Sequence, residues 1–380
     1  MRPIRILHIV GGMNRGGAET WLMHVLRNID RNRYHMDILV HREEDWAYNE
    51  EILTLGSRII PCMKFSRPWK YARNFLRILE KYGPYDIVHS HVHHYSGFVL
   101  RLAQQAKIPV RIAHSHSDTS SIDSKANLIR RGYLYVTEKL ILRHATLGLA
   151  ASRKAAEALF SRNWESDQRW RILYCAIDPT HFRGAIDPDI IRAELGIPIN
   201  AFVIGHVGRF DEAKNHDFLV DIAVEIFKKE PKMFLLLVGD GPLRTNIKQK
   251  IIRVGLDNRV IFAGLRSDVH RLMLGAIDVI LMPSLYEGLP LVGIESQAAG
   301  VPVIISDVIT EEMDIVKPLV WRLSLLQQSS AWAEEILKLR NIPSIITKSR
   351  ALEIVESTPF NIQKCVKELE CLYGNKLPQG

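Results

Sequence analysis

The sequence predicts an α/β protein made of two doubly wound, Rossmann-like domains. Short apolar segments rich in Ile and Val alternate with helical stretches, and the whole alternation starts again after residue 181. Strands of a parallel sheet are buried on both faces and appear in a sequence as continuous apolar runs of this kind. The chain has 380 residues, whereas a single core stops growing at about 250–300 residues. Two domains are therefore expected.

The first half carries the signals of one complete parallel sheet. Helical spacing of apolar residues is seen at Glu19–Ile29 and Trp69–Tyr82. The expected strands are short and apolar, and they are Ile4–Val10, Met36–Val40, Arg58–Pro61, Tyr85–His89, Val110–His114, Leu147–Ala151 and Arg171–Tyr174. Because helices alternate with these strands, a doubly wound sheet is predicted.

The second half repeats the pattern after a connector rich in turn residues, Ala176–His181. Its first helix is expected at Asp217–Lys229, and an amphipathic helix at Asn361–Tyr373 ends the chain. The expected strands are Phe202–Val207, Met233–Val238, Val260–Ala263, Val279–Met282 and Pro302–Ile305. We expect one domain over residues 1–178, a second over 182–355, and a final helix within 356–380 that crosses back to the first domain.

Composition narrows the class of protein. No apolar stretch reaches the roughly 18 residues that span a bilayer, and the apolar start of the chain is too short for a signal peptide, so the cytoplasm is expected. The four cysteines lack the spacing of a zinc site or a disulfide framework.

Residues 1–180 hold 27 Lys and Arg against 17 Asp and Glu, whereas residues 181–380 hold 23 against 25. A basic half favours phosphorylated substrates, an anionic membrane surface or nucleic acid.

The sharpest motif runs from Ser284 to Glu295 as Ser-Leu-Tyr-Glu-Gly-Leu-Pro-Leu-Val-Gly-Ile-Glu, between an apolar strand and a helix. Gly288 permits close backbone approach and Pro290 suits a first helical turn. Free N–H groups at such a helix start would hold a phosphate. Glu295 would accept hydrogen bonds from the two hydroxyls of a ribose. A capped helix with two solvated glutamates explains the same residues equally well.

Two glycine-containing loops follow other expected strands. In Gly205–Asn215, Arg209 and Lys214 would neutralise a diphosphate, one as a planar fork and the other as a point charge. The alternative interpretation is that Arg209 and Lys214 are simply two exposed cations of a loop. The loop Gly11–Glu19 would cradle phosphate with backbone donors. It lacks the G-x-G-x-x-G order, so a nicotinamide site is disfavoured, and no P-loop motif occurs.

Histidines gather at the ends of two expected strands, in His89–His94 and His114–His116. A metal site is not expected there, because each run alternates faces and no carboxylate or thiol lies at ligand spacing. A hydrogen bond from one imidazole to a sugar fits better. Asp187-Pro188-Asp189 matches the D-x-D of metal-dependent transferases, but it lies in a connector and is expected to begin a helix.

In this order the motifs resemble the retaining glycosyltransferases of family 4, which have the GT-B fold of two Rossmann-like domains facing each other across a cleft. The resemblance covers nearly the whole chain and is closest to the bacterial exopolysaccharide and capsule branch. Its most specific element is the E-x7-E pair Glu287 and Glu295. Two departures stand out: the connector at Cys175 reads Cys-Ala-Ile-Asp in place of Asn-Gly-Ile-Asp, and the segment 306–313 lacks the common glycine-rich turn.

The resemblance implies a metal-independent hexosyltransferase that takes its sugar from a nucleotide diphosphate sugar, a UDP-sugar, and uses no cofactor. Residues 1–178 would bind the acceptor and residues 182–355 the donor. Arg209 and Lys214 would act on the diphosphate, with Glu287 and His116 at the transferred sugar. Glu295 would bind the ribose, and Gly264 to Arg266 the base. The full set of expected donor-binding residues is Gly16, Gly17, Gly208, Gly264, Leu265, Arg266, Gly288, Leu289, Pro290, Leu291 and Glu295.

The expected acceptor is a glycan or a lipid-diphosphate-linked sugar, bound by the basic first half at the inner face of the cell membrane. A solvated helix face explains the same charges, and no nucleic-acid module supports nucleic acid. The basic residues are Arg67, Lys70, Arg73, Arg77, Lys125, Arg130, Arg131 and Lys139, with Trp69 and Tyr71 between them. Two other functions stay open: a nucleotide-sugar epimerase with the same fold, and a non-catalytic nucleotide-sugar binding protein.

Overall fold

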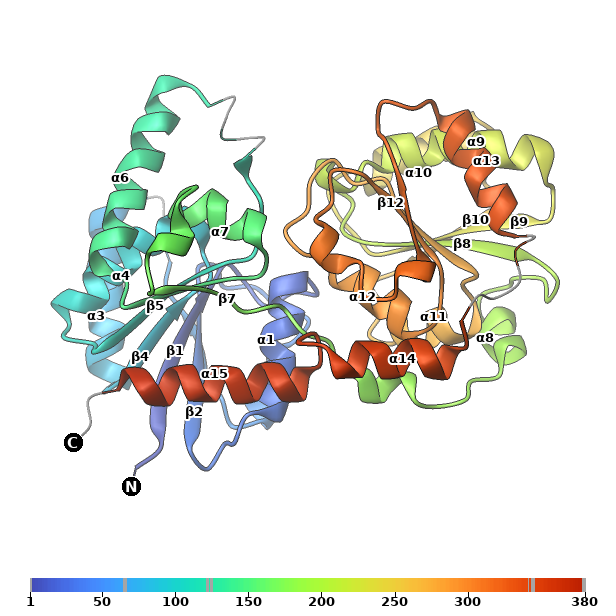
Figure 1. The fold of residues 1–380 in the computed structure, drawn as a ribbon. Helices are drawn as coiled ribbons and strands as arrows, with labels where there is room; N and C mark the ends of the chain where they lie inside the picture. The colour runs from blue at the N-terminus through green and yellow to red at the C-terminus, as the bar shows by residue number, and fades with distance from the viewer. Residues whose placement is uncertain are drawn as a thin grey trace. The chain divides into compact units, whose positions relative to one another are not determined.

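The computed structural model describes residues 2–377 apart from 64–66, 121–122, 124–125, 341 and 343–345. The chain divides into two compact units, each with its own sheet (Figure 1). Unit 1 consists of Met1–Ala176 and Ile362–Gly380, and unit 2 of Ile177–Asn361. All strand pairs within both sheets are parallel. The predicted α/β class with two Rossmann-like domains is confirmed.

Unit 1 is built on a seven-stranded sheet in the order β3-β2-β1-β4-β5-β6-β7. Its strands are β1 (Ile4–Val10), β2 (Tyr34–Val40), β3 (Ile59–Pro61), β4 (Ile87–Ser90), β5 (Val110–Ser115), β6 (Leu147–Ala150) and β7 (Trp170–Ile172). Its helices are α1 (Gly17–Asn28), α2 (Asn49–Thr54), α3 (Pro68–Tyr82), α4 (Ser96–Gln105), α6 (Leu128–His144), α7 (Arg153–Phe160) and α15 (Ile362–Lys376).

The last helix, α15, belongs to the first unit although it ends the chain. It packs against α1, as Figure 1 shows in red and blue. Tyr373 is fully buried, and the Tyr34 hydroxyl donates to the carbonyl oxygen of Glu370 at 3.1 Å. Apolar residues at helical spacing thus give α15 a face that completes the core of unit 1.

Unit 2 has a six-stranded sheet in the order β10-β9-β8-β11-β12-β13. Its strands are β8 (Phe202–Val207), β9 (Met233–Val238), β10 (Val260–Gly264), β11 (Val279–Met282), β12 (Val303–Ser306) and β13 (Val320–Leu323). Its helices are α8 (Pro188–Glu194), α9 (His216–Lys229), α10 (Arg244–Arg253), α11 (Val269–Gly275), α12 (Leu291–Ala298), α13 (Ser329–Leu339) and α14 (Lys348–Ser357).

Every expected strand is present, with bounds shifted by up to two residues. Strand β13 was not predicted, because this edge strand is only partly buried and contains Arg322, whose guanidinium binds Asp314 at 2.7 Å. The predicted helix start at Asp187 is confirmed, since its side chain accepts from the N–H of Asp189 at 3.0 Å.

One expectation about α3 is wrong. Tyr71 was expected on an exposed basic face, but its side chain is fully buried and its hydroxyl lies 3.1 Å from Nε2 of His41. The ring also stacks on Phe75. Tyr71 therefore belongs to the core, whereas Trp69, two residues earlier, is exposed. Lys125, another residue expected on the basic face, lies outside the described residues.

Candidate active site

The sheet of unit 2 changes direction between β8 and β11. From β8 the chain first builds β9 and β10 on one side, then crosses to β11 on the other. In open parallel sheets, ligands bind at the carboxyl ends of the strands at such a switch point, because the loops diverge there. The loops that leave β8 and β11 carry the motifs around Lys214 and Glu287, so the topology brings these two motifs together.

Backbone contacts hold these two loops against each other. The N–H of Leu285 donates to the carbonyl oxygen of Ala213 at 2.8 Å, and the Asn215 side-chain amide donates to that of Pro283 at 3.0 Å. Asn215 has a φ of +53°, which Asn tolerates better than most residues. The loops are thus fixed before any ligand arrives.

Lys214 and Glu287 form an ion pair across this junction, with 2.5 Å between Nζ and Oε1. Both side chains are largely buried, so the pair is weakly screened by water. Arg209, in contrast, is 71% exposed, and its nearest recorded carboxylate is Asp211 at 4.0 Å. The site therefore holds one tightly paired cation and one exposed cation that is only loosely paired with Asp211. The sequence indicated all three residues but not their pairing.

The start of α12 offers backbone donors beside this pair. In the described part of the chain, the N–H groups of Gly288 and Leu289 have no protein partner, and no side chain caps the helix at Pro290. Gly288, Leu289 and Leu291 are buried. Unpaired buried N–H groups at a helix start attract an anion. Phosphate binding by this segment stays a prediction.

Glu295 lies in α12 and is partly buried. Burial raises the pKa of its carboxyl to about 7. Among the described residues its carboxyl has no protein hydrogen bond or ion pair, which distinguishes it from Glu287. A carboxyl held in apolar surroundings without a partner is a common mark of a binding site.

Three glycines line the adjacent strand ends. The N–H of Gly208 donates to the Val238 carbonyl oxygen at 2.9 Å, and the N–H of Gly239 to that of Gly264 at 2.8 Å. A Cβ on Gly239, which has a φ of +135°, would overlap the backbone of Gly208. Gly208 and Gly264 thus lie at the ends of β8 and β10 with β9 between them. Beyond them Leu265 is exposed.

Arg266 lies at the end of this group and already has a partner. Its guanidinium binds the Asp268 carboxylate at 2.7 and 2.8 Å. The pair neutralises much of the charge of Arg266 and fixes the loop after β10. If Arg266 contacts a ligand, it would therefore do so by stacking the flat face of its guanidinium or through its backbone, because its charge is already paired with Asp268.

Gln297 was not predicted to have a role, but its side chain holds the loop after β12 in place. Its side-chain oxygen accepts from the N–H groups of Ile315 at 3.0 Å and Val316 at 2.7 Å, and its amide donates to the Met313 carbonyl oxygen at 2.8 Å. This loop lacks the glycine-rich turn expected of the family. Because Gln297 is fully buried in α12, the loop is tied to the same helix that carries Glu295.

Unit 1 has its own switch point, between β1 and β4. The glycine loop after β1 ends in Gly16, the N-cap of α1, and Gly17, the first helical residue. Gly17 is exposed and has open space where a Cβ would lie. The Glu19 carboxylate already lies at this helix start, close to Gly16, so an incoming anion would have to displace it. Phosphate binding by this loop stays a prediction.

His116 follows β5 and is one of five imidazoles packed on one face of this sheet. We call His8, His89, His91, His114 and His116 the imidazole cluster. Nε2 of His116 lies 2.8 Å from Nδ1 of His91, and its Nδ1 lies 3.4 Å from the Cys175 sulfur. Burial lowers the pKa of His116 to about 3, so the ring is neutral. The sequence indicated two separate histidine runs and gave no reason to include His8.

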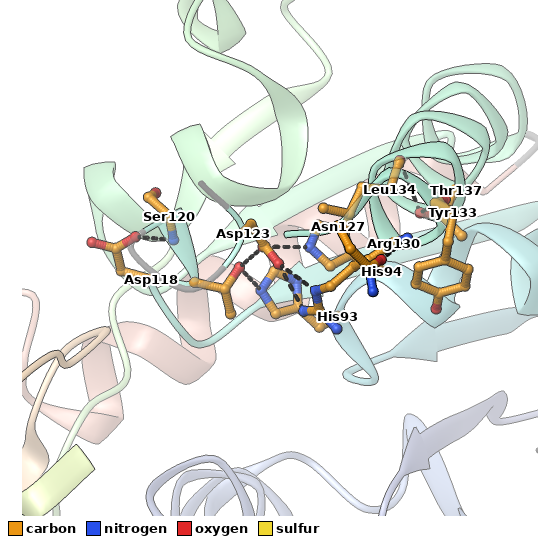
Figure 2. Close-up of polar contacts among 11 residues, drawn as sticks. His93, His94, Asp118, Ser120, Asp123, Asn127, Arg130, Tyr133, Leu134 and Thr137 are labelled. Atoms are coloured by element: carbon orange, nitrogen blue, oxygen red, sulfur yellow. Dashed lines mark hydrogen bonds and ion pairs between the residues drawn. The ribbon is translucent and has the colours of Figure 1, made fainter. Parts of the chain in front are cut away.

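A second polar network joins the loops after β4 and β5. Figure 2 shows these side chains converging on Asp123. The Asp123 carboxylate accepts from Thr119 at 2.5 Å and from Arg130 at 2.7 Å, and lies 3.2 Å from Nε2 of His94. Asn127 caps α6 by accepting from the Arg130 N–H at 2.9 Å. The segment between β5 and α6 is thereby tied to the end of β4.

The two units match two known protein families. Residues 16–174 match the family described as glycosyl transferase 4-like domain, and residues 187–351 match glycosyl transferases group 1. EpsF of Bacillus subtilis (strain 168), named as a glycosyltransferase, is 40% identical over 337 residues, which cover 88% of this chain and 87% of EpsF. The chain belongs to the family 4 glycosyltransferases. This confirms the resemblance found in the sequence.

Other relatives are named for the synthesis of polysaccharides and lipid-linked sugars. The capsular polysaccharide glycosyltransferase CapH of Staphylococcus aureus is 27% identical over 384 residues, covering 98% of this chain and 99% of CapH. The UDP-Gal:alpha-D-GlcNAc-diphosphoundecaprenol alpha-1,3-galactosyltransferase of Escherichia coli is 26% identical over 302 residues, covering 78% and 76%. Neither the epimerase nor the non-catalytic alternative is favoured by these relatives.

Solved structures confirm the GT-B fold. Anabaena Alr3699/HepE, whose structure was determined in complex with UDP and glucose, superposes with a TM-score of 0.81 at 21% identity, covering 98% of this glycosyltransferase and 99% of that chain. Within the described residues, no helix combines the length and the apolarity that crossing a bilayer requires.

The raised pKa of Glu295 predicts a pH-dependent stability. The folded protein keeps this proton up to about pH 7, whereas an unfolded Glu loses it near 4.3. The free energy of unfolding therefore falls by about 2–3 kcal/mol as pH rises through this window. Glu295→Gln removes this contribution. Urea unfolding at pH 5 and pH 8 measures it, with the exposed Glu311→Gln as control, and an unchanged slope in Glu295→Gln contradicts the assignment.

Proposed function

We propose that this glycosyltransferase transfers a sugar from a UDP-sugar to a glycan or lipid-linked acceptor, with retention of anomeric configuration and without a metal ion in the transfer step. The observation that carries the proposal is the meeting of two cations and free backbone N–H groups at the switch point of unit 2. Departure of a nucleoside diphosphate leaves negative charge on its β-phosphate, and such groups stabilise that charge.

The diphosphate would lie between Arg209, Lys214 and the start of α12. Lys214 is held in place by Glu287 at 2.5 Å, so it needs no reorganisation to meet a phosphate. The exposed guanidinium of Arg209 contributes a planar fork of donors. The N–H groups of Gly288 to Leu291, with Pro290 between them, contribute positive charge at the helix end. These groups supply the electrostatic role that a metal ion has in other transferases.

The nucleoside would extend from the diphosphate along the strand ends. Glu295 would accept hydrogen bonds from the ribose hydroxyls, which favour the ionised carboxylate and offset the burial that raises its pKa. Gly264, Leu265 and Arg266 would line the base. Uracil is proposed because UDP is the nucleotide named for the HepE complex. Gly208 lets the nucleotide approach the backbone closely.

Each unit offers one side chain that suits a sugar hydroxyl. On unit 2, Glu287 would accept hydrogen bonds from sugar hydroxyls on the side away from Lys214. On unit 1, His116 would donate to or accept from a sugar as a neutral imidazole, since burial lowers its pKa to about 3. Also on unit 1, the start of α1 at Gly16 and Gly17 would offer backbone donors to a phosphate.

The reaction exchanges one bond for another at the anomeric carbon. The bond between this carbon and the β-phosphate oxygen breaks, and the acceptor oxygen forms the new bond on the same face. The acceptor proton passes to the leaving phosphate oxygen, so no protein nucleophile is needed. Arg209, Lys214 and the α12 N–H groups stabilise the departing charge, and exclusion of water prevents hydrolysis of the donor.

Arg209→Ala is expected to lower the rate of sugar transfer by about 100-fold or more, because one source of charge stabilisation is lost. The assay follows UDP release and product formation with a lipid-diphosphate sugar acceptor, without and with magnesium. Arg253→Ala, an exposed arginine of α10, is the matched control. UDP at a hundredfold excess over its Kd should stabilise the wild type by about 2.7 kcal/mol. Full activity of Arg209→Ala would sink this mechanism.

The acceptor is proposed to be linked to a lipid diphosphate, as the name of the E. coli relative states for that enzyme. Helix α6 supports this, because Leu128 and Ile129 at its start are 84% and 86% exposed and lie beside Arg130 and Arg131. Exposed apolar side chains with adjacent cations suit an anionic membrane surface. Arg130 contributes less charge than expected, since Asp123 pairs with it at 2.7 Å.

Co-sedimentation with vesicles tests this surface. The wild type is expected to bind vesicles that contain anionic lipid and to dissociate as salt rises, since each basic residue contributes about 1 kcal/mol. Leu128→Ser/Ile129→Ser should weaken binding at least about tenfold through loss of apolar burial. Leu326→Ser, at a 97% exposed leucine of unit 2, is the control. Binding that ignores both lipid charge and the α6 substitutions would refute the surface.

A further inference from the structure

The imidazole cluster of unit 1 concentrates five nitrogen ligands, of which the proposed sugar transfer uses only His116. His8 lies on β1, His89 and His91 at the end of β4, and His114 and His116 at the end of β5. Residues two apart on a strand share a face, and β1, β4 and β5 are neighbours. Three strands thus bring onto one face imidazoles that lie far apart in the sequence.

The ring nitrogens approach one another closely. Nδ1 of His91 lies 2.8 Å from Nε2 of His116, and one nitrogen each of His91, His114 and His116 fall within 4.8 Å of one another. Two imidazole nitrogens bound to one tetrahedral zinc at about 2.0–2.1 Å are about 3.3–3.4 Å apart. The His91 and His116 nitrogens are therefore about half an ångström closer than two coordinated nitrogens would be. The His114 nitrogen, which lies within 4.8 Å of them, would have to reach the same separation of about 3.3–3.4 Å.

We propose that, in the enzyme without bound donor, His91, His114 and His116 form a binding site for a divalent transition-metal ion, with zinc as the reference ion. Because Nε2 of His116 would then lie on the metal and its Nδ1–H on the Cys175 sulfur, this site and the sugar contact of His116 in the proposed function exclude each other. The sequence disfavoured a metal because each histidine run alternates faces and no carboxylate or thiol lies at ligand spacing. In the fold, three imidazoles from the ends of the neighbouring strands β4 and β5 come together, and three imidazoles can hold zinc without a carboxylate or thiol. Imidazole nitrogen suits zinc, nickel, cobalt and copper, whereas magnesium and calcium prefer oxygen.

The hydrogen-bond partners of the three rings support this site. A metal-bound histidine needs an acceptor for its other N–H. With His91 bound through Nδ1, its Nε2–H would donate to Nδ1 of His8 at 3.0 Å. With His116 bound through Nε2, its Nδ1–H would donate to the Cys175 sulfur at 3.4 Å. Both ligands then have a second-shell partner already in place.

His114 provides the strongest atom-level support. Its Nε2 is buried and has no hydrogen-bond partner among the described residues. Its Nδ1 lies 3.1 Å from Nε2 of His89, whose Nδ1 lies 2.8 Å from the Tyr373 hydroxyl. If Nε2 of His114 bound the metal, its Nδ1–H would donate to Nε2 of His89. The Nδ1–H of His89 would in turn donate to the Tyr373 hydroxyl oxygen. The metal would occupy the lone pair that otherwise faces no partner.

A deeper group, His8, His89 and His91, also has nitrogens within 4.8 Å, but it suits a metal less well. His8 and His89 are fully buried, so neither ring offers an ion a way in from solvent. His91 and His116 are only partly buried and lie just past the ends of their strands, so an ion has a route to them. A site needs such an entry path as well as ligands.

Metal titration of the full chain tests the proposal independently of sugar transfer. Chelator-treated protein is titrated with cobalt chloride, followed by visible d–d absorption, and with zinc chloride against a chromophoric chelator. One equivalent is expected to bind to the wild type. His114→Gln should lower affinity by about 100-fold, and Cys175→Ala, which removes a second-shell acceptor, by about tenfold.

His93→Gln is the matched control, because His93 is a neighbouring imidazole of the same unit outside the cluster. It should bind metal as the wild type does. Circular dichroism checks the fold of every variant, and the wild-type titration decides the matter even if His114→Gln does not fold. Less than about 0.1 equivalent bound to wild type would overturn the site and leave a hydrogen-bonded imidazole network. Binding that survives in His114→Gln and Cys175→Ala would overturn it equally.

Discussion

The ion pair between Lys214 and Glu287 determines how the switch point of unit 2 is organised. It joins the loops that follow β8 and β11, and the backbone bond from Leu285 to Ala213 keeps the two loops in register. Because both side chains are largely buried, removing either one would leave an uncompensated charge. A cation is thereby held at the switch point in the absence of ligand. Arg209 lies 4.0 Å from the Asp211 carboxylate, a looser contact, so its guanidinium can move toward an incoming diphosphate.

Each sheet has a switch point, but the side chains at the two switch points differ in chemistry. In unit 2 the switch point carries charges and free N–H groups, which suit a phosphate. In unit 1 the corresponding face carries neutral imidazoles, and burial lowers the pKa of both His8 and His116 to about 3. A neutral polar layer recognises hydroxyl groups or binds a metal without attracting a second anion. This division accords with a donor site on unit 2 and sugar contacts on unit 1.

Local patterns in the sequence were enough to predict most of the fold. Continuous apolar runs marked the buried strands, and Asp187 before Pro188 marked the start of α8. The missed strand β13 is partly exposed and contains Arg322, so neither apolarity nor alternation identified it. Tyr71 was placed on the wrong face, because an aromatic among cations in α3 gives no sign that its hydroxyl meets His41 inside the core.

The motifs of the candidate site were also readable from the sequence, but the pairings were not. Glycines and cations after strands indicated a phosphate site, yet Lys214 and Glu287 are 73 residues apart, and only the strand order brings them together. His8 joined the imidazole cluster for the same reason, since β1 lies beside β4. In the sequence, Gln297 is one polar residue of a helix with no sign of a special role. In the structure, its side-chain amide is hydrogen-bonded to the backbone of residues 313–316.

The preference of the protein for UDP over UMP, measured by calorimetric titration, tests whether Lys214 and its neighbours hold the β-phosphate. The wild type should bind UDP at least about tenfold more tightly than UMP, since a charge-assisted contact to phosphate contributes about 1.5–3 kcal/mol. In Lys214→Met/Glu287→Gln, which removes both charges and leaves neither unpaired, most of this preference should disappear. An unchanged ratio of the two Kd values in the double variant would contradict the account.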